Sequence, residues 1–256
     1  MSKIIQGDCR KKLKELPDES VDCIVTSPPY WGLRDYGVDN QLGTEKKITD
    51  YVNNLADVFD ECKRVLKKTG TAWLNIGDSY ATNGIYIGTY LKKHPQHKDL
   101  HTDNSTRYPQ KLKGYRNEKE NIKAKDLCLI PFRVALELQQ RGWYVRSDII
   151  WAKPNPMPES VRDRPTKSHE YIFLLSKSKN YHYDADAIRE PIKENNKGFI
   201  MARARTASGA LGGKNKHNME KREYSEIKGA NKRDVWKITT KPYKEAHFAT
   251  FPKDLI

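Results

Sequence analysis

The sequence lacks the features of membrane-spanning and disulfide-rich proteins. No apolar run approaches the roughly 20 residues that a helix needs to cross a bilayer, and the N-terminus has no signal-peptide pattern. The four cysteines are scattered, with no C-x-x-C pair and no histidine pair nearby, so we expect reduced thiols and no zinc ligands. Three loop histidines, at 94, 97 and 101, are expected to be solvent-exposed. We predict a cytoplasmic protein without a membrane partner or a metal site.

Positive charge is abundant but unevenly distributed. The formal net charge is +14. Residues 91–125 contain 10 lysines and arginines against 4 acidic residues, and residues 193–244 contain 14 against 5. The rest of the chain is nearly neutral. A phosphate backbone is the partner that such segments favour, with two solvated loops as the alternative.

The most informative stretch is Ser27-Pro28-Pro29-Tyr30, which follows an apolar run that predicts a short buried strand. Two prolines fix φ and carry no N–H, and α/β sheets place ligands at the carboxyl ends of their strands. The exocyclic amino group of cytosine or adenine is a weak nucleophile. Ser27 Oγ and the Pro28 carbonyl are suitable acceptors for its N–H bonds, and Tyr30 could stack on a flipped base. The alternative is a stiff turn between a strand and a loop.

With Trp31-Gly32-Leu33-Arg34 directly after it, this stretch resembles the catalytic motif of the DNA amino-methyltransferases. That family uses S-adenosylmethionine to methylate cytosine N4 or adenine N6. The resemblance implies an α/β fold, a Rossmann-like sheet with helices on both faces, and a site-specific enzyme in a restriction–modification or phage setting. A serine in the first position is more typical of cytosine-N4 enzymes. Cytosine N4 is therefore expected, with adenine N6 as the nearest alternative and methylation of RNA or of protein amides ranked below both.

The resemblance also implies roles for individual residues. The catalytic residues would be Ser27, Pro28, Pro29 and Tyr30. The cofactor would lie against Asp8, Cys9, His247, Phe248, Ala249, Thr250, Phe251 and Pro252. The target base and the double-stranded DNA, the expected partner, would meet Trp31, Arg34, Trp151, Lys153, Arg162, Arg164, Arg203, Arg205, Lys214 and Lys216. Two alternatives stay open from the residues themselves, because Asp8 could equally cap a helix and Trp151 could equally pack in a core.

Apolar periodicity predicts the remaining elements. Helices are expected over 50–68 and 127–140, with a short one near 13–16, and strands over 3–6, 21–25, 71–76, 143–151, 171–176 and 234–238. We expect a catalytic core over 1–184 that includes a basic loop at 81–125, a target-recognition region over 185–233, and a return to the core over 234–256. Asn75-Ile76-Gly77-Asp78 would shape the target-base pocket, with an ordinary polar strand end as the alternative. His169 is not expected to act as a general base.

One part of the family pattern is missing. No G-x-G occurs in the chain, whereas the permuted group that it resembles continues with Phe-x-Gly-x-Gly and an acidic residue. We therefore expect a sheet that is incomplete at its C-terminal cofactor half. A truncated reading frame or a second polypeptide that supplies the missing half would explain this. The chain alone is expected to bind S-adenosylmethionine weakly, and a non-catalytic DNA-binding remnant is the alternative function.

Overall fold

The computed structural model describes residues 3–33, 36–81, 122–191, 229–241 and 252–255. The chain divides into two compact units, residues 1–182 with 234–256 and residues 183–233. The basic loop that the sequence predicts at 81–125 lies largely outside the described residues, as does most of the predicted target-recognition region.

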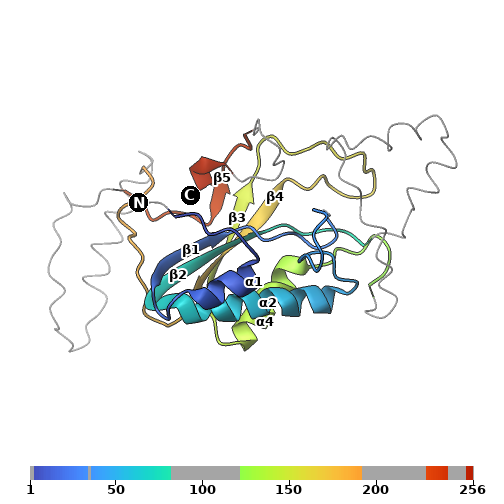
Figure 1. Cartoon of the computed structure of the whole chain (residues 1–256). Helices are drawn as coiled ribbons and strands as arrows, with labels where there is room; N and C mark the ends of the chain where they lie inside the picture. Colours follow the sequence, from blue (N-terminus) through green and yellow to red (C-terminus); the bar gives the residue numbers. More distant parts are fainter. Residues whose placement is uncertain (1–2, 34–35, 82–121, 192–228, 242–251, 256) are drawn as a thin grey trace, which may run out of the picture. The chain divides into compact units, whose positions relative to one another are not determined.

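The first unit is built on a mixed five-stranded sheet in the order β1-β2-β4-β3-β5 (Figure 1). Its strands are β1 (Val21–Thr26), β2 (Leu66–Ile76), β3 (Tyr144–Ala152), β4 (His169–Ser176) and β5 (Val235–Lys237). The β1–β2 and β3–β5 pairs are parallel, and the β2–β4 and β3–β4 pairs are antiparallel. The open sheet confirms the α/β class predicted from the sequence.

The parallel β1–β2 pair requires a crossover connection, and α2 (Ile48–Val65) supplies it. Its apolar residues recur every three or four positions, which places one continuous stripe against the sheet. The buried members of that stripe are Ile48, Tyr51, Val52, Leu55, Ala56, Val58, Phe59, Cys62 and Val65. The helix ends three residues earlier than the sequence predicts, because Leu66 is fully buried and already pairs with Val21 of β1.

A second amphipathic helix, α4 (Ile130–Gln140), packs beside α2. Pro131 lies in its first turn, where a missing N–H costs nothing, and Gly142 follows the helix with a φ of +82°. The short α1 (Cys9–Lys12) and the 3₁₀ turn η1 (Leu13–Glu15) complete this layer. In Figure 1 the helices α1, α2 and α4 lie on the same side of the sheet. The helices that the sequence predicts for the opposite face are not among the described residues.

Two apolar clusters result, because successive strand residues point to opposite faces. The larger lies between the sheet and the helices and includes Phe59, Leu74 and Leu138. The smaller lies on the opposite face and consists of Ile149, Trp151 and Ile172, with Trp73 and Trp236 partly buried against it. A further 3₁₀ turn, η4 (Lys253–Leu255), contributes Leu255 to the smaller cluster.

The strand predicted over 3–6 does not form. Residues 3–6 have no strand partner in the described part of the chain, and Ile4 is 94% exposed. Two adjacent isoleucines favour extended backbone, but a strand also needs a neighbour with unpaired ladder groups. None of the described helices is both long enough and apolar enough to cross a membrane.

The described residues of the second unit are 183–191 and 229–233. A short antiparallel bridge joins them, with Glu190 and Ala230 exchanging backbone hydrogen bonds of 2.9 and 2.8 Å. The Glu190 carboxylate pairs with Arg233 at 2.6 Å. These contacts hold together the two ends of the segment that the sequence assigns to target recognition.

Candidate functional site

The backbone of Ser27-Pro28-Pro29-Tyr30 is held rigidly at the carboxyl end of β1. The buried Tyr51 hydroxyl on α2 donates to the Pro29 carbonyl at 2.9 Å. A Cβ at Gly43 would lie 2.8 Å from the Tyr30 carbonyl oxygen, so only glycine allows this approach. The Pro28 carbonyl accepts no hydrogen bond from any residue that the structure describes, and it keeps its acceptor capacity for a ligand.

Four polar side chains from three segments meet here, two of them from the motif itself. The Tyr30 hydroxyl donates to Glu170 Oε2 on β4 at 2.6 Å. Asn75, at the end of β2, donates from Nδ2 to the Tyr30 hydroxyl and to Glu170 Oε2, both at 3.0 Å. Ser27 Oγ donates to the Tyr30 hydroxyl oxygen at 3.3 Å. The antiparallel pairing of β2 with β4 brings Asn75 and Glu170 together, because Ile76 of β2 is registered with Tyr171 of β4.

Lys153 completes the cluster from the loop after β3. Its ammonium forms an ion pair with Glu170 Oε1, and the two side chains are 19% and 18% exposed. The same ammonium lies 4.3 Å from the centre of the Trp151 ring, close enough for a cation–π interaction. The Lys153 backbone N–H donates to the Ser168 carbonyl at 2.8 Å, which fixes the start of the loop. Lys153 is thereby joined to the Ser27–Tyr30 motif through one carboxylate.

Burial shapes the protonation of the site. Burial, reinforced by the charge of Glu170, holds the pKa of Tyr30 well above its ordinary value near 10, so the phenol keeps its proton. Burial also lowers the pKa of Lys167, whose ammonium donates to the Asp78 carbonyl at 2.6 Å. The pKa of His169 is lowered by burial as well, and its Nε2 lies 3.2 Å from the Tyr171 hydroxyl. Among the described residues, the site therefore combines the neutral Tyr30 phenol with the half-buried ion pair of Lys153 and Glu170.

Two buried oxygens at the end of β2 and in the loop after it have no hydrogen-bond partner among the described residues, Asn75 Oδ1 and Asp78 Oδ2. The other Asp78 oxygen accepts from the Ser79 and Ile130 backbone N–H groups at 2.9 and 3.0 Å, which caps the start of α4. A Cβ at Gly77 would lie 2.8 Å from the Tyr30 ring, so the glycine between them is required for Tyr30 to sit here. Unpaired buried acceptors of this kind are satisfied by water or by a bound ligand.

A family model described as DNA methylase matches residues 21–256. The chain belongs to this DNA methylase family. The type II methyltransferase M.Cfr9I of Citrobacter freundii is 43% identical over 253 residues, which cover 99% of this chain and 69% of that protein. The type II methyltransferase M.SmaI of Serratia marcescens is 45% identical over 252 residues, covering 98% of this chain and 71% of that protein.

A solved structure, the cytosine-N4-specific PvuII DNA methyltransferase, superposes with a TM-score of 0.48 and 16% identity. The superposition covers 78% of this chain and 61% of that one. The chain thus spans about seven-tenths of the two curated relatives and less than two-thirds of this structure.

Two tryptophans that the sequence assigns to the target base, Trp31 and Trp151, are buried in the structure. Trp31 is 7% exposed and donates from Nε1 to the Glu45 carbonyl at 2.9 Å. Trp151 is 3% exposed and donates to the Ile238 carbonyl at 2.8 Å. This position agrees with the alternative that Trp151 packs in a core. Neither indole presents an open face to solvent in the described part of this methylase. Contact of either ring with a base stays a prediction.

Most of the other described residues that the sequence assigns to the site lie near the surface. Asp8 caps α1 by accepting from the Arg10 N–H at 2.9 Å and pairs with the Arg10 guanidinium at 2.7 Å. Arg164 pairs with Glu159 at 2.7 Å and lies 3.8 Å from the Tyr80 ring centre, whereas Arg162 is exposed. Cys9 is exposed and Pro252 is buried. The predicted site residues outside the described part of the chain are Arg34, Arg203, Arg205, Lys214, Lys216, His247, Phe248, Ala249, Thr250 and Phe251.

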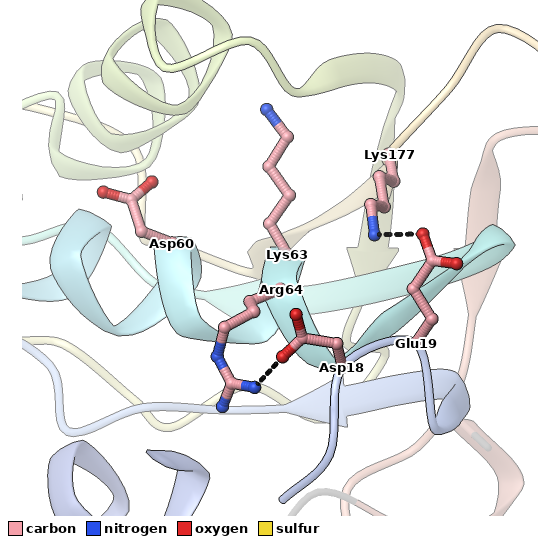
Figure 2. Close-up of a pocket in the computed structure, with 6 residues that line it drawn as sticks. All are labelled: Asp18, Glu19, Asp60, Lys63, Arg64 and Lys177. Carbon is pink, nitrogen blue, oxygen red and sulfur yellow. Dashed lines mark hydrogen bonds and ion pairs between the residues drawn. The ribbon is translucent and has the colours of Figure 1, made fainter.

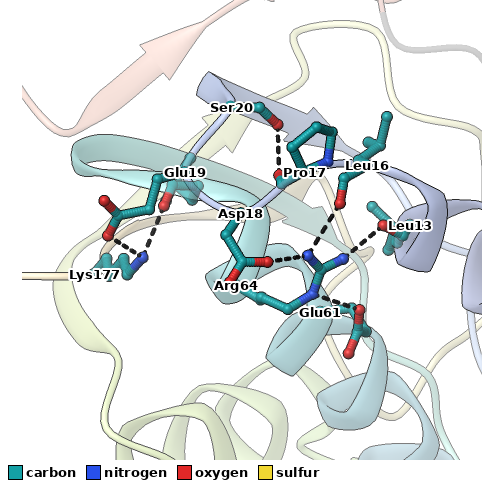
Figure 3. Close-up of polar contacts among 10 residues, drawn as sticks. Leu13, Leu16, Pro17, Asp18, Glu19, Ser20, Glu61, Arg64 and Lys177 are labelled. Atoms are coloured by element: carbon teal, nitrogen blue, oxygen red, sulfur yellow. Dashed lines mark hydrogen bonds and ion pairs between the residues drawn. The ribbon is translucent and has the colours of Figure 1, made fainter.

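A surface hollow elsewhere in the unit has a structural role. Figure 2 shows three acidic and three basic side chains around it, namely Asp18, Glu19, Asp60, Lys63, Arg64 and Lys177. Two of the cations are paired, Arg64 with Asp18 and Lys177 with Glu19. Figure 3 shows the Arg64 guanidinium donating also to the Leu13 and Leu16 carbonyls, at 2.8 and 3.0 Å. The hollow joins the N-terminal segment to α2, and its balanced charges favour no ligand.

Glu170 is the functional candidate that sequence reasoning missed. Its only signal is an acidic residue at the start of the apolar strand His169–Ser176, which equally suits a solvent-exposed strand end. Its partners Tyr30 and Asn75 are 140 and 95 positions away in the sequence. Only the strand register brings them together. In the described part of the chain, no group of three acidic, histidine or cysteine side chains is arranged to hold a metal ion.

Proposed function

We propose that the chain carries the target-base site of a site-specific DNA methyltransferase of a type II restriction–modification system, acting on cytosine N4. The observation that carries this proposal is the geometry at Ser27. Its hydroxyl donates to Tyr30, and the adjacent Pro28 carbonyl is unoccupied by any described donor. Ser27 Oγ and the Pro28 oxygen are therefore two acceptors next to each other on a rigid backbone.

Two acceptors suit the chemistry of an exocyclic amino group. Its lone pair is delocalised into the base, and hydrogen bonds to both N–H groups favour a pyramidal nitrogen whose lone pair points at the methyl donor. Acceptors that are already in place need no reorganisation during the reaction. Tyr51 and Gly43 hold the motif in position, which supplies this rigidity. A serine at the first position of the motif supports cytosine N4 over adenine N6.

S-adenosylmethionine supplies the electrophilic methyl group when it is bound. Among the described residues, Asp8 fits a role in holding it. The Asp8 side chain is 34% exposed, and its two oxygens offer acceptor positions beyond the bonds from Arg10. A ribose hydroxyl or an adenine amino group would donate to them. The segment 247–251, predicted to contact the methionine part of the cofactor, lies outside the described residues.

DNA is the proposed macromolecular substrate, and the two basic segments at 91–125 and 193–244 are proposed to contact its phosphates. Base reading is assigned to residues 185–233, with Arg203, Arg205, Lys214 and Lys216 as the proposed contacts. The comparisons do not support a second polypeptide, because M.Cfr9I and M.SmaI each contain the matching segment within one longer chain.

Mass spectrometry of nucleosides tests the proposal directly. DNA from cells that express the intact gene is digested and compared with DNA from cells that carry an empty vector. We expect N4-methylcytosine above background at one short recognition sequence. N6-methyladenine in its place would contradict the cytosine assignment. The absence of any methylated amino base, with DNA binding retained, would favour the non-catalytic remnant.

A further inference from the structure

Glu170 can only accept hydrogen bonds at its Oε2, and two donors converge there. The Tyr30 hydroxyl lies 2.6 Å away and Asn75 Nδ2 lies 3.0 Å away. The second carboxylate oxygen is paired with the Lys153 ammonium. An ionised carboxylate has no proton to donate, so both of its oxygens act as acceptors. Both hydrogen bonds at Glu170 Oε2 are therefore donated to the carboxylate, by Tyr30 and by Asn75.

The direction of the Tyr30–Glu170 hydrogen bond also determines the direction of the hydrogen bond between Ser27 and Tyr30. A phenol has one hydrogen, and here it is directed to Glu170. The phenol oxygen can therefore only accept, and it accepts from Asn75 at 3.0 Å and from Ser27 Oγ at 3.3 Å. Because the single Ser27 hydrogen points at Tyr30, the Ser27 oxygen presents lone pairs to any ligand. Asn75 Nδ2 approaches Ser27 Oγ only at 3.5 Å, so at least one lone pair is left for the ligand.

We propose that Glu170 is a positioning residue that makes Ser27 a hydrogen-bond acceptor, and so selects a base with an amino group over one with a carbonyl at the same ring position. This inference rests on the proposed function of the site. Glu170 does not touch the base and acts through Tyr30 and Ser27. Lys153 has a supporting role, because its ammonium pairs with Oε1 and leaves Oε2 to Tyr30 and Asn75.

The expected consequence is discrimination at the target position. Cytosine carries an amino donor at C4 and uracil carries a carbonyl acceptor there. An oxygen that can only accept is repelled by the carbonyl oxygen of uracil, whereas a hydroxyl free to rotate could donate to it. Sites built to pair with one polar group reject the analogue that lacks it, because buried groups are then left unpaired. The wild-type protein should therefore bind cytosine-containing DNA more tightly than a duplex with uracil at the target.

The test uses Glu170→Gln in the intact protein. The amide has the same shape as the carboxylate but can donate, so Tyr30 and Ser27 are no longer restricted to one direction. The matched control is Glu137→Gln on α4, because Glu137 is 24% exposed and ion-paired with Arg141 at 2.7 Å. Two quantities are measured, the rate of methyl transfer and the ratio of affinities for cytosine and uracil duplexes. Should the modified base prove to be adenine, hypoxanthine replaces uracil.

We expect Glu170→Gln to lower kcat on the order of 100-fold and to reduce the affinity ratio, which stays above one because the Pro28 carbonyl can still only accept. The overall affinity for DNA should change less than about 3-fold, and Glu137→Gln should match the wild type in both quantities. An unchanged affinity ratio in Glu170→Gln would overturn the inference. So would equal losses of kcat and DNA affinity.

A second measurement does not depend on methylation. Unfolding free energies are determined for Glu170→Gln, Tyr30→Phe and the double variant, and their non-additivity gives the coupling between the two side chains. We expect the effect of Tyr30→Phe to be clearly smaller when Glu170 has already been replaced. Additive effects would refute the role of Glu170 even if the enzyme methylates DNA. Absence of methylation with strong coupling would refute the proposed function alone.

Discussion

The Tyr51 hydroxyl donates a hydrogen bond to the Pro29 carbonyl oxygen across 2.9 Å. This bond joins the first turn of α2 to the motif after β1, and Tyr51 is fully buried. A helix that forms because of its apolar stripe thus also fixes the backbone of the candidate site. Burial raises the pKa of Tyr51 far above its ordinary value, so the phenol stays a donor at physiological pH.

Tyr51→Phe should therefore lower the stability of the protein. The substitution leaves the Pro29 carbonyl without this donor, and we expect the free energy of unfolding to fall by about 1–3 kcal/mol. Urea denaturation at pH 7 measures this. Tyr144→Phe is the control, because Tyr144 is 44% exposed on β3 and should change stability by less than about 0.5 kcal/mol. Equal effects of the two substitutions would contradict the anchoring role of Tyr51.

Gly77→Ala should displace Tyr30. The added Cβ would lie 2.8 Å from the Tyr30 ring, and overpacking of this kind costs about 1–3 kcal/mol. We expect lower stability together with a loss of methyl transfer, because the Tyr30 hydroxyl would move away from Glu170. In Gly37→Ala the added Cβ meets no atom within 4 Å, so only the cost of its φ of +70° should appear and activity should persist. Full activity in Gly77→Ala would show that the position of Tyr30 is unimportant.

Alkaline pH should destabilise the protein partly through Cys62. Burial raises the pKa of the Cys62 thiol from an ordinary value near 9.0 to about 12. The folded protein therefore retains a proton that the unfolded chain loses above pH 9, so the contribution of the thiol to stability is complete below pH 9 and declines up to about pH 12. Between pH 9 and 10 the loss approaches about 1.4 kcal/mol at most.

Cys62→Ala removes this titration and should flatten the dependence of unfolding free energy on pH between 9 and 10. The substitution also costs some stability at neutral pH, because Cys62 packs in the larger cluster, so the slopes and not the absolute values are compared. Identical slopes in the two proteins would show that the Cys62 thiol does not titrate differently on unfolding.

Arg64→Met should loosen the N-terminal segment locally. The guanidinium donates to the Leu13 and Leu16 carbonyls and pairs with Asp18 and Glu61. Hydrogen exchange should become several-fold faster in residues 13–20, with little change in α4. Arg162→Met, at an exposed position, should leave both regions unchanged. Unaltered exchange in residues 13–20 of Arg64→Met would show that the Arg64 hydrogen bonds drawn in Figure 3 do not hold the N-terminal segment in place.

The sequence was sufficient to predict the elements whose pattern is local. The stripe of α2, the first-turn proline of α4 and the apolar runs of β2 and β4 each predict the observed element, because their periodicity reflects the face that they bury. The apolar run of β1 predicts its strand, but the expected burial is wrong, because β1 lies at the edge of the sheet and Val25 is 46% exposed. The strand predicted over 3–6 failed because pairing depends on a neighbour. Ile4 and Ile5 favour extended backbone, but they do not determine which strand would lie beside them.

The site was predictable where one segment carries it and not where several segments meet. Ser27 to Tyr30 are consecutive, so their chemistry could be inferred together. Glu170 and Lys153 join them only because β4 lies between β2 and β3 in the sheet. The role of Trp151 could not be decided from the sequence. An aromatic residue beside a predicted site looks the same in sequence whether it stacks on a base or packs in a core.

The methyl-transfer rate of Ser27→Ala, measured beside its affinity for DNA, tests the acceptor role of Ser27 most directly. Ser20→Ala is the matched control, because Ser20 precedes the same strand at its opposite end and donates to the Pro17 carbonyl at 2.7 Å. We expect Ser27→Ala to reduce methylation severely, on the order of 100-fold, with DNA affinity nearly unchanged and with Ser20→Ala similar to the wild type. Equal losses of methylation and DNA binding in Ser27→Ala, or undiminished methylation, would contradict the role of Ser27 as the acceptor for the target amino group.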